Sequence, residues 1–425
     1  MISFQEKKTK DFLHRHLLDA ECFDWKTELS RFLAEMENVR NGADGSVKMI
    51  PTWIRKLQPL ERPLSVTAID IGGTNVRSTV VTLDQTGIIG MDSLPSFQTP
   101  GIQEQITAEE FFRRIVSGLG DGGHLHTDHI GICFSLATVP LKDGDAIVSA
   151  GAKQIDVVDL IGKRVGQSFR AAAKELGYPN DQKITVINDT IAAALSGWSD
   201  HQEGNYSGFA GFIYGTGTNI AYQENDEVMI NIESGAYCGF PTGDIDDLFD
   251  ATLIDAGQDR FEKMVSGGYQ GGLMTFVLRK AVEENLLYAD FFDRLDAVRK
   301  TKPISAKDIS EYSHGIAKEN IFLCTCRDNY ERFVLSKLFD AVCRRSALLC
   351  GVTITGALLR AERRDSKTPV FFTAEGSTYL KQMNFSRYLD TYLKTYGKAL
   401  GGLPYEIHST ENAVIKGTAI SALLH

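Results

Sequence analysis

The chain has 425 residues, of which 43% are hydrophobic and 24% are charged. This composition is typical of a soluble globular protein, and the length exceeds what one hydrophobic core usually serves, so we expect two or three domains. The formal net charge of -10 argues against a protein that binds nucleic acid through the phosphate backbone, because such proteins carry a basic face. Any anionic ligand must then be held by local chemistry.

The cysteine count and the length of the apolar stretches indicate a cellular location for the protein. The seven cysteines are few and odd in number, which favours reduced thiols in a cytoplasmic protein over a disulfide framework. The first 25 residues carry charges at short intervals and lack the apolar core of a signal peptide. The longest charge-free apolar stretch, residues 346–359, is shorter than the roughly 18 to 20 residues that span a bilayer. We therefore expect a cytoplasmic protein without a membrane partner.

The predicted elements alternate between strand-rich and helical regions. Residues 1–40 have apolar residues at helix-face spacing, and a turn-rich cluster at 41–45 ends that region. From residue 66 come short strands rich in branched residues, then two buried strands near 129–136 and 184–189 that flank a helix at 165–177. A second strand group covers 208–234, and helices with one strand at 370–374 follow. This order suggests a duplicated α/β core.

The first candidate site is the segment Asp70-Ile71-Gly72-Gly73-Thr74-Asn75, between two predicted strands. A turn with two glycines lets backbone N–H groups approach an anion, and Thr74 and Asn75 add donors. An acidic residue at the end of the preceding strand can hold a hydrated Mg²⁺, which takes only one or two carboxylates. The alternative is an ordinary hairpin turn, which turn chemistry alone favours.

A second glycine-threonine turn, Gly215-Thr216-Gly217-Thr218-Asn219, lies in the second strand group. Two such turns favour phosphate binding more than one does, because opposing loops can hold a polyphosphate from both sides. Neither turn is a Walker loop, since neither contains GxxxxGK[ST].

A third candidate is Asp189, which follows Asn188 at the end of the apolar strand 184–187 and opens a helix-like run. A carboxylate in this position can accept a proton from a hydroxyl group that attacks phosphorus. The alternative is a helix N-cap, which is the commoner role of an isolated Asn-Asp-Thr at such a junction.

Four further polar residues stand in apolar contexts: Ser135, Lys153, Glu233 and Glu262. A sugar pocket needs several groups that donate and accept in fixed directions, although each of these residues taken singly fits a solvated surface better. The histidines of the segment GGHLHTDH at 122–129 suggest a metal site, but an exposed loop is the favoured interpretation.

Taken in chain order, these motifs resemble the eukaryotic-type hexokinase family of the actin-like ATPase superfamily. The matching segments are SVKMIPT (46–52), AIDIGGTNVR (68–77), FS (134–135), INDT (187–190), YGTGTN (214–219), NIESGAY (231–237), FEKMVSG (261–267), AEGSTY (374–379) and KGTA (416–419). The resemblance implies two α/β domains with mixed five-stranded sheets around a central cleft. It implies an N-terminal helical segment (1–60) on the large domain, a small domain (61–188), a large domain (189–410) and a C-terminal helix (411–425) that returns to the small domain.

The same resemblance implies a role for each matching residue. Asp189 becomes the catalytic base, and Lys153 orients the sugar and stabilises charge. Asp70 holds Mg²⁺ through water, while Arg77 faces the phosphates of ATP. The sugar ligands are Ser135, Asn188, Asn219, Glu233 and Glu262, and the residues at ATP are Gly72, Gly73, Thr74, Asn75, Thr216, Gly217, Gly376, Ser377 and Thr378.

The implied activity is ATP-dependent phosphorylation of a hexose at its 6-hydroxyl group, with glucose as first candidate and mannose or fructose beside it. The chain departs from the family pattern where Gly151-Ala152 replaces Trp-Thr before Lys153, and where Glu375-Gly376 replaces Asp-Gly. The alternatives are therefore a kinase for another sugar such as an amino sugar, or a sugar-binding regulator without catalysis. An actin-like or chaperone ATPase fits less well, because it has no sugar pocket. The sequence leaves open whether the protein is a monomer or a homodimer.

Overall fold

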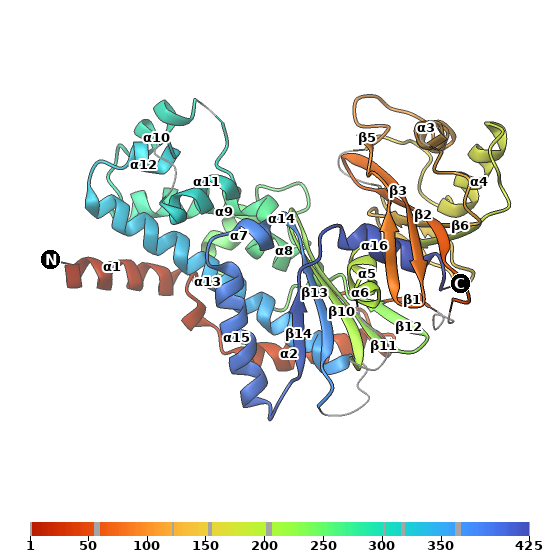
Figure 1. Ribbon diagram of the computed structural model, residues 1–425. Coiled ribbons are helices and arrows are strands. Elements are labelled where there is room, and N and C mark those ends of the chain that lie inside the picture. The colour runs from red at the N-terminus through yellow and green to blue at the C-terminus, as the bar shows by residue number, and fades with distance from the viewer. Residues whose placement is uncertain are drawn as a thin grey trace.

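The computed structural model describes residues 2–54, 60–120, 123–151, 155–200, 206–300, 302–315, 319–361 and 367–424. Most of the described strands form two large sheets, which lie side by side, with a group of helices beyond the second (Figure 1). We call the sheet that contains β2 the first sheet and the one that contains β10 the second sheet. A two-stranded ribbon of β7 (Thr138–Pro140) and β8 (Ala146–Val148) is separate from both.

The first sheet has the order β4-β3-β2-β6-β9, and β5 also pairs with β3. Strands β2, β3 and β4 are antiparallel neighbours, whereas β2, β6 and β9 run parallel. The carboxyl ends of these three parallel strands meet at one edge, which is where ligands bind in open α/β sheets. The bounds are β2 Leu64–Ile71, β3 Asn75–Asp84, β4 Gly87–Met91, β5 Ser96–Gln98, β6 His129–Phe134 and β9 Lys183–Ile187.

Helices cover both faces of the first sheet. On one face, α3 (Ala108–Gly120) and α4 (Val165–Glu175) share a core with β2 and β6, into which Phe111 and Phe169 pack. On the other face lies α16 (Ala413–Ser421), which contacts β2, β6 and β9. Burial on both sides explains why β2 is continuously apolar or uncharged up to Asp70, rather than alternating.

The second sheet has the order β1-β12-β11-β10-β13-β14. Strands β10, β13 and β14 are parallel, and the other neighbours are antiparallel. On one face α13 (Asn329–Arg360) packs together with α2 (Trp25–Arg40) and α15 (Phe385–Ala399). The bounds are β1 Ile50–Trp53, β10 Gly208–Tyr214, β11 Thr218–Asn225, β12 Val228–Asn231, β13 Val370–Glu375 and β14 Tyr405–His408.

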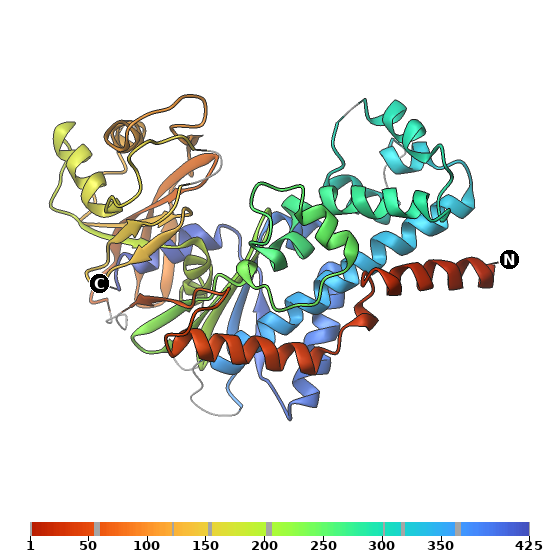
Figure 2. The ribbon, with the colours of Figure 1, turned by 180° about the vertical axis from the view of Figure 1, so that it is seen from behind.

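A helical group around the N-terminal half of α13 lies at the end of the molecule away from the first sheet (Figure 2). Its helices are α1 (Ile2–Arg15), α9 (Gly267–Glu283), α10 (Phe291–Arg299), α11 (Ala306–His314) and α12 (Ile321–Thr325). The short elements between this group and the second sheet are η1 (Ala20–Cys22), η2 (Ser234–Ala236), α7 (Asp244–Asp250), α8 (Arg260–Val265) and α14 (Ser377–Lys381).

By length and composition, α13 alone among the described helices could cross a membrane. However, 89% of its most apolar window is buried inside the protein, as in the core helix of a folded domain. Arg345, within that window, is fully buried and donates to both carboxylate oxygens of Asp246, at 2.8 and 2.9 Å. A buried charge needs such a partner, and this ion pair fits a helix in the core of a folded domain.

The helix α5 (Asp189–Leu195) lies between the two sheets, and a glycine of a neighbouring element contacts it on each side. A Cβ atom on Gly211 of β10 would lie 2.7 Å from the Thr190 carbonyl oxygen. A Cβ atom on Gly417 of α16 would lie 1.7 Å from the Ala192 carbonyl oxygen. Both contacts join backbone to backbone, so only glycine fits at positions 211 and 417. These contacts attach α5 both to the second sheet and to the helix that covers the first.

Each sheet has six described strands, where the sequence predicted five. The additional strands are β1, which precedes the region of branched residues, and β5, which has only three residues and no recognisable alternation. The prediction of an exposed loop at the histidines was also wrong in part. His124 is buried, and its Nδ1 lies 2.7 Å from the Ser78 hydroxyl oxygen. The predicted domain boundaries at residues 60, 188 and 410 remain predictions.

The contact between α5 and α16 predicts the effect of Gly417→Ala. Alanine favours a helix over glycine by about 1 kcal/mol, so propensity alone would stabilise the variant. We expect the opposite, a free energy of unfolding lowered by about 1–3 kcal/mol, because the methyl group meets the Ala192 backbone. Urea unfolding followed by circular dichroism measures this. The control is Gly90→Ala, whose Cβ finds only Thr82, at 3.9 Å; equal stability of Gly417→Ala and wild type contradicts the account.

Candidate active site

Asp189 is the first residue of α5, and Asn188, between β9 and this helix, caps it by accepting a hydrogen bond from the Thr190 N–H at 2.8 Å. Asn188 therefore has the N-cap role considered from the sequence, and the Asp189 carboxylate does not cap the helix. The Thr190 hydroxyl donates to Asp189 at 3.1 Å. Burial and the negative charge of Asp70 raise the pKa of Asp189, whereas the hydrogen bond from the Thr190 hydroxyl lowers it.

Asp70 lies near the end of β2 and is 6% exposed. Arg77 of β3, its partner in the β-ladder, donates to Asp70 Oδ2 from two nitrogens, at 2.5 and 3.1 Å. Arg77 was predicted to face phosphates, and in this structure it forms an ion pair with the carboxylate predicted to hold Mg²⁺. The pair leaves the Arg77 side chain 40% exposed.

The first glycine turn, Gly72 to Asn75, is closed and braced by backbone contacts. The Gly72 N–H donates to the Asn75 carbonyl oxygen at 3.0 Å. Thr99, which follows β5, donates its hydroxyl to the Gly72 carbonyl at 2.7 Å and its N–H to the Thr74 carbonyl at 3.0 Å. Thr74 and Asn75 are exposed. Thr99 was missed by the sequence interpretation, because a threonine between two loops carries no motif.

The second glycine turn, Gly215 to Gly217, rests on the start of α9. The N–H groups of Gly267 and Gly268 donate to the carbonyls of Gly215 and Thr216, at 2.9 and 3.0 Å. The Thr378 hydroxyl also donates to the Gly215 carbonyl, at 2.9 Å. These bonds occupy the carbonyl side of the turn.

The opposite side of this turn carries two backbone N–H groups and lies beside the Glu262 carboxylate, whose Oε2 would be 2.5 Å from a Cβ on Gly217. Among the described residues, the N–H groups of Thr216 and Gly217 have no hydrogen-bond partner, and Thr216 is exposed. Gly376 adjoins the turn with φ 121°, and a Cβ there would lie 2.3 Å from the Tyr214 carbonyl oxygen. Ser377, next to it, is exposed. Successive unpaired N–H groups form a concavity suited to phosphate.

Asn219 and Glu233 belong to one hydrogen-bonded group with Asn231. Asn231 donates to Glu233 Oε1 at 2.6 Å, and Asn219 donates to the same oxygen at 3.3 Å. Asn219 also donates to Asn231 Oδ1 at 2.8 Å. Burial and the negative charge of Asp189 raise the pKa of Glu233, whereas the hydrogen bond from Asn231 lowers it. Asn231, only 3% exposed, was missed by the sequence interpretation although it lies within a matching motif.

Glu262 of α8 contacts both the second turn and the loop after Glu233. Its Oε2 accepts the Thr218 N–H at 2.9 Å, and a Cβ on Gly235 would lie 3.1 Å from that oxygen. Ser135 follows β6 and donates its N–H to the Ile71 carbonyl oxygen at 3.1 Å, next to Asp70. Lys153 lies outside the described residues.

The structure thus brings most predicted residues to the junction of the two sheets. Asp189 interacts electrostatically with Asp70, with Glu233 and with Glu375. Glu375 was not among the predicted site residues, although it ends a strand directly before Gly376. Its position at a strand end, the same signal that identified Asp70, could have found it.

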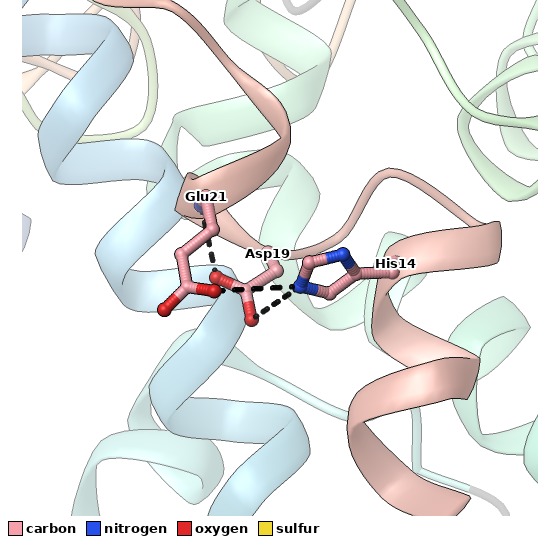
Figure 3. Close-up of side chains that lie close together, drawn as sticks. All are labelled: His14, Asp19 and Glu21. Carbon is pink, nitrogen blue, oxygen red and sulfur yellow. Dashed lines mark hydrogen bonds and ion pairs between the residues drawn. The ribbon is translucent and has the colours of Figure 1, made fainter. Parts of the chain in front are cut away.

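A separate group of possible metal ligands lies at the end of α1 and just after it: His14, Asp19 and Glu21 (Figure 3). His14 Nε2 lies 3.7 Å from Asp19 and 3.6 Å from Glu21. Lys10 donates to Glu21 at 2.8 Å, so a cation already balances this group, and Asp19 caps η1. Helix α1, which carries His14, lies on the side of the molecule away from β2 (Figure 1), so this ion-pair cluster is separate from Asp70.

Two hexokinase family models match the chain, one over residues 14–198 and the other over residues 209–424. The chain belongs to the hexokinase family. Among curated relatives, hexokinase-2 of Homo sapiens is 27% identical over 98% of this chain and 48% of the relative, and hexokinase-1 of Mus musculus is 27% identical over 84% and 40%. The chain spans about half the length of these hexokinases.

Solved hexokinase structures share the fold. One hexokinase crystal structure has a TM-score of 0.78 at 20% identity, over 99% of each chain. The hexokinase from Schistosoma mansoni complexed with glucose has a TM-score of 0.75 at 19% identity, again over 99% of each chain. The predicted fold class, two actin-like α/β domains, is confirmed.

The hydrogen bond from Asn231 gives a titration test of the network around Glu233. Asn231→Leu removes a donor that stabilises the Glu233 anion, so we expect the pKa of Glu233 to rise further. ¹³C NMR of labelled glutamate side chains measures the midpoint. The control is Asn225→Leu, whose side chain is exposed and accepts the Glu227 N–H, with no other hydrogen bond to the described residues. An unchanged midpoint in Asn231→Leu contradicts the assigned network.

Proposed function

We propose that this chain is an ATP-dependent hexokinase that phosphorylates a hexose at its 6-hydroxyl group. The observation that carries the proposal is Asp189, a carboxylate whose pKa is raised by burial and by Asp70, and which begins the helix that contacts both β10 and α16. A base with a raised pKa holds an abstracted proton better than an ordinary carboxylate does. Family membership supports the same reaction class.

In the proposed reaction, Asp189 accepts the proton of the sugar hydroxyl as its oxygen attacks the γ-phosphorus of ATP in line. The unpaired N–H groups of Thr216 and Gly217 and the turn at Gly72 to Asn75 bind phosphate oxygens. Gly376, Ser377 and Thr378 lie at the adenosine, and Lys153 offsets the developing charge. Glu233, held by Asn219 and Asn231, accepts hydrogen bonds from sugar hydroxyls, with Ser135, Asn188 and Glu262 beside it.

The residues fit a hydrated Mg²⁺ at Asp70. This carboxylate lies at a strand end beside an open turn, and both hydrogen bonds that Arg77 donates to it go to Oδ2. Mg²⁺ keeps most of its waters and takes one or two carboxylates, which matches such a site. When bound, the ion supplies charge neutralisation for the phosphate oxygens.

Glucose is the first candidate substrate, and one structural neighbour is named as a glucose complex. Mannose, fructose or an amino sugar stay open because Gly151 and Ala152 replace the family's Trp-Thr. We also propose a cytoplasmic location, supported by seven cysteines that are all within the described residues and free.

An ADP-formation assay across glucose, mannose, fructose, galactose, glucosamine and N-acetylglucosamine separates the candidates. Sugar-dependent ADP release establishes the kinase and ranks its substrates. Sugar binding without any ADP release favours the non-catalytic regulator instead.

Asp189→Ala tests the base directly. We expect kcat to fall by a factor of about 10² or more, because the proton of the attacking hydroxyl loses its acceptor. The hexose Kd, measured by calorimetry, changes far less. The control is Asp181→Ala, an exposed residue before the opposite end of β9. A near-normal kcat for Asp189→Ala removes the basis of the mechanism.

A further inference from the structure

A buried ion pair joins α7 to α8 and has no part in the proposed reaction. Lys263 of α8 is 3% exposed, and its Nζ atom donates to Asp250 Oδ1 at 2.6 Å and to the Asp255 carbonyl oxygen at 2.7 Å. Asp250, the last residue of α7, is 4% exposed. Its Oδ2 atom accepts the Gly257 N–H at 2.7 Å and the Arg260 guanidinium group at 2.9 Å. The pair thus closes the loop between the two helices.

An ion pair in this place is not explained by stability alone. Taking a carboxylate and an ammonium group out of water is unfavourable, and an apolar pair of the same size often stabilises a fold equally well. Burial opposes ionisation of Asp250, but the hydrogen bonds from Lys263 and Gly257, together with the charges of Lys263 and Arg260, lower the pKa of this carboxyl below its usual value. An ion pair is directional where an apolar contact is not, so its effect lies in the orientation of α8.

The other contacts of α8 leave this orientation to be set. The helix has six residues, and Phe261 and Val265, four positions apart and both fully buried, pack into the core beside the second sheet. Apolar packing is non-directional, so by itself it does not fix the rotation of so short a helix about its axis. The hydrogen bonds from Lys263 to α7 and to the loop do fix it.

Glu262, the neighbour of Lys263 in α8, depends on this rotation. Its Oε2 atom accepts the Thr218 N–H at 2.9 Å, so turning α8 would move the carboxylate relative to the second turn. The same helix contacts η2, which directly follows Glu233. The placement of α8 therefore bears on both carboxylates that the proposed function assigns to the hexose.

We propose that Asp250 and Lys263 are positioning residues for hexose binding, which hold α8 in the rotation that presents Glu262 to the sugar. The inference rests on the proposed function, in which Glu262 is a sugar ligand, and adds two residues that do not touch the substrate. Asp189 begins α5, which is placed by its contacts with β10 and α16. The ion pair consequently acts on hexose affinity rather than on the proton acceptor.

The test replaces the pair by neutral side chains of similar size, in the variant Asp250→Asn/Lys263→Met. Both charges are removed together, so neither stays buried without its partner, and the asparagine oxygen can still accept the Gly257 N–H. We expect the hexose KM and the calorimetric hexose Kd to rise about tenfold, because the Glu262 hydrogen bond to the sugar is misdirected, while kcat changes less than about threefold. A role in stability alone would lower the active fraction, and so kcat, at an unchanged hexose KM.

The matched control is the buried ion pair between α10 and α13. Arg294 donates to both carboxylate oxygens of Glu331, at 2.9 and 2.6 Å, and Glu331 is 0% exposed and also accepts the Arg327 N–H at 2.8 Å. Arg294→Met/Glu331→Gln makes the same chemical change in the helical group and should leave the hexose KM unchanged. An equal rise of the hexose KM in both double variants overturns the assignment.

A variant that keeps one charge covers the case in which the double variant does not fold by circular dichroism. In Asp250→Asn alone, Lys263 keeps an acidic partner, because its Nζ atom lies 3.2 Å from Asp255 Oδ1. The same split between hexose KM and kcat is expected, and a hexose KM equal to that of wild type overturns the role.

A double-mutant cycle with Glu262→Gln shows whether the pair acts through Glu262. If it does, adding Glu262→Gln to Asp250→Asn/Lys263→Met gives a hexose Kd within about twofold of that of Glu262→Gln alone. Independent effects would multiply, and that result overturns the inference. Wild type that neither binds nor phosphorylates any hexose refutes the proposed function itself, which is a different result from an active enzyme whose hexose affinity does not depend on the pair.

Discussion

The position of α5 between Gly211 and Gly417 is the constraint on which the rest of the site depends. The helix has seven residues and few polar side chains, so its own hydrogen bonds do not fix where it lies. Two backbone-to-backbone contacts do so, one to a strand of the second sheet and one to a helix on the first. Asp189, at the start of this helix, is thereby placed where both sheets contribute residues.

The same placement explains the electrostatics. Asp70 lies near the end of a strand of the first sheet, Glu375 ends a strand of the second, and Asp189 interacts electrostatically with both. The negative charge of Asp70 disfavours ionisation of both Asp189 and Glu375. Burial acts in the same direction, so the pKa values of Asp189 and Glu375 both rise. The site is suited to accepting a proton and to binding a cation with its phosphate ligand.

The strand ends and glycine turns could be predicted from the sequence, because they depend on local patterns. Asp70, Asp189 and Gly215 were found in this way, and the order of the motifs identified the family. Contacts between distant segments could not be predicted. Thr99 braces a turn from another strand, and Asn231 acts through a hydrogen bond that depends on the pairing of β11 with β12. The pairing of Arg77 with Asp70 likewise follows from the register of β2 and β3.

The most direct test of the account is the protonation of Asp189 itself. Infrared difference spectra of wild type against Asp189→Asn, recorded across pH, isolate the carboxyl band of this residue. The account predicts a midpoint clearly above the ordinary value of 3.8, because the side chain is buried at the junction and faces Asp70. A midpoint at or below that value would mean that Asp189 is solvated or paired with a cation, and would contradict its role as the base.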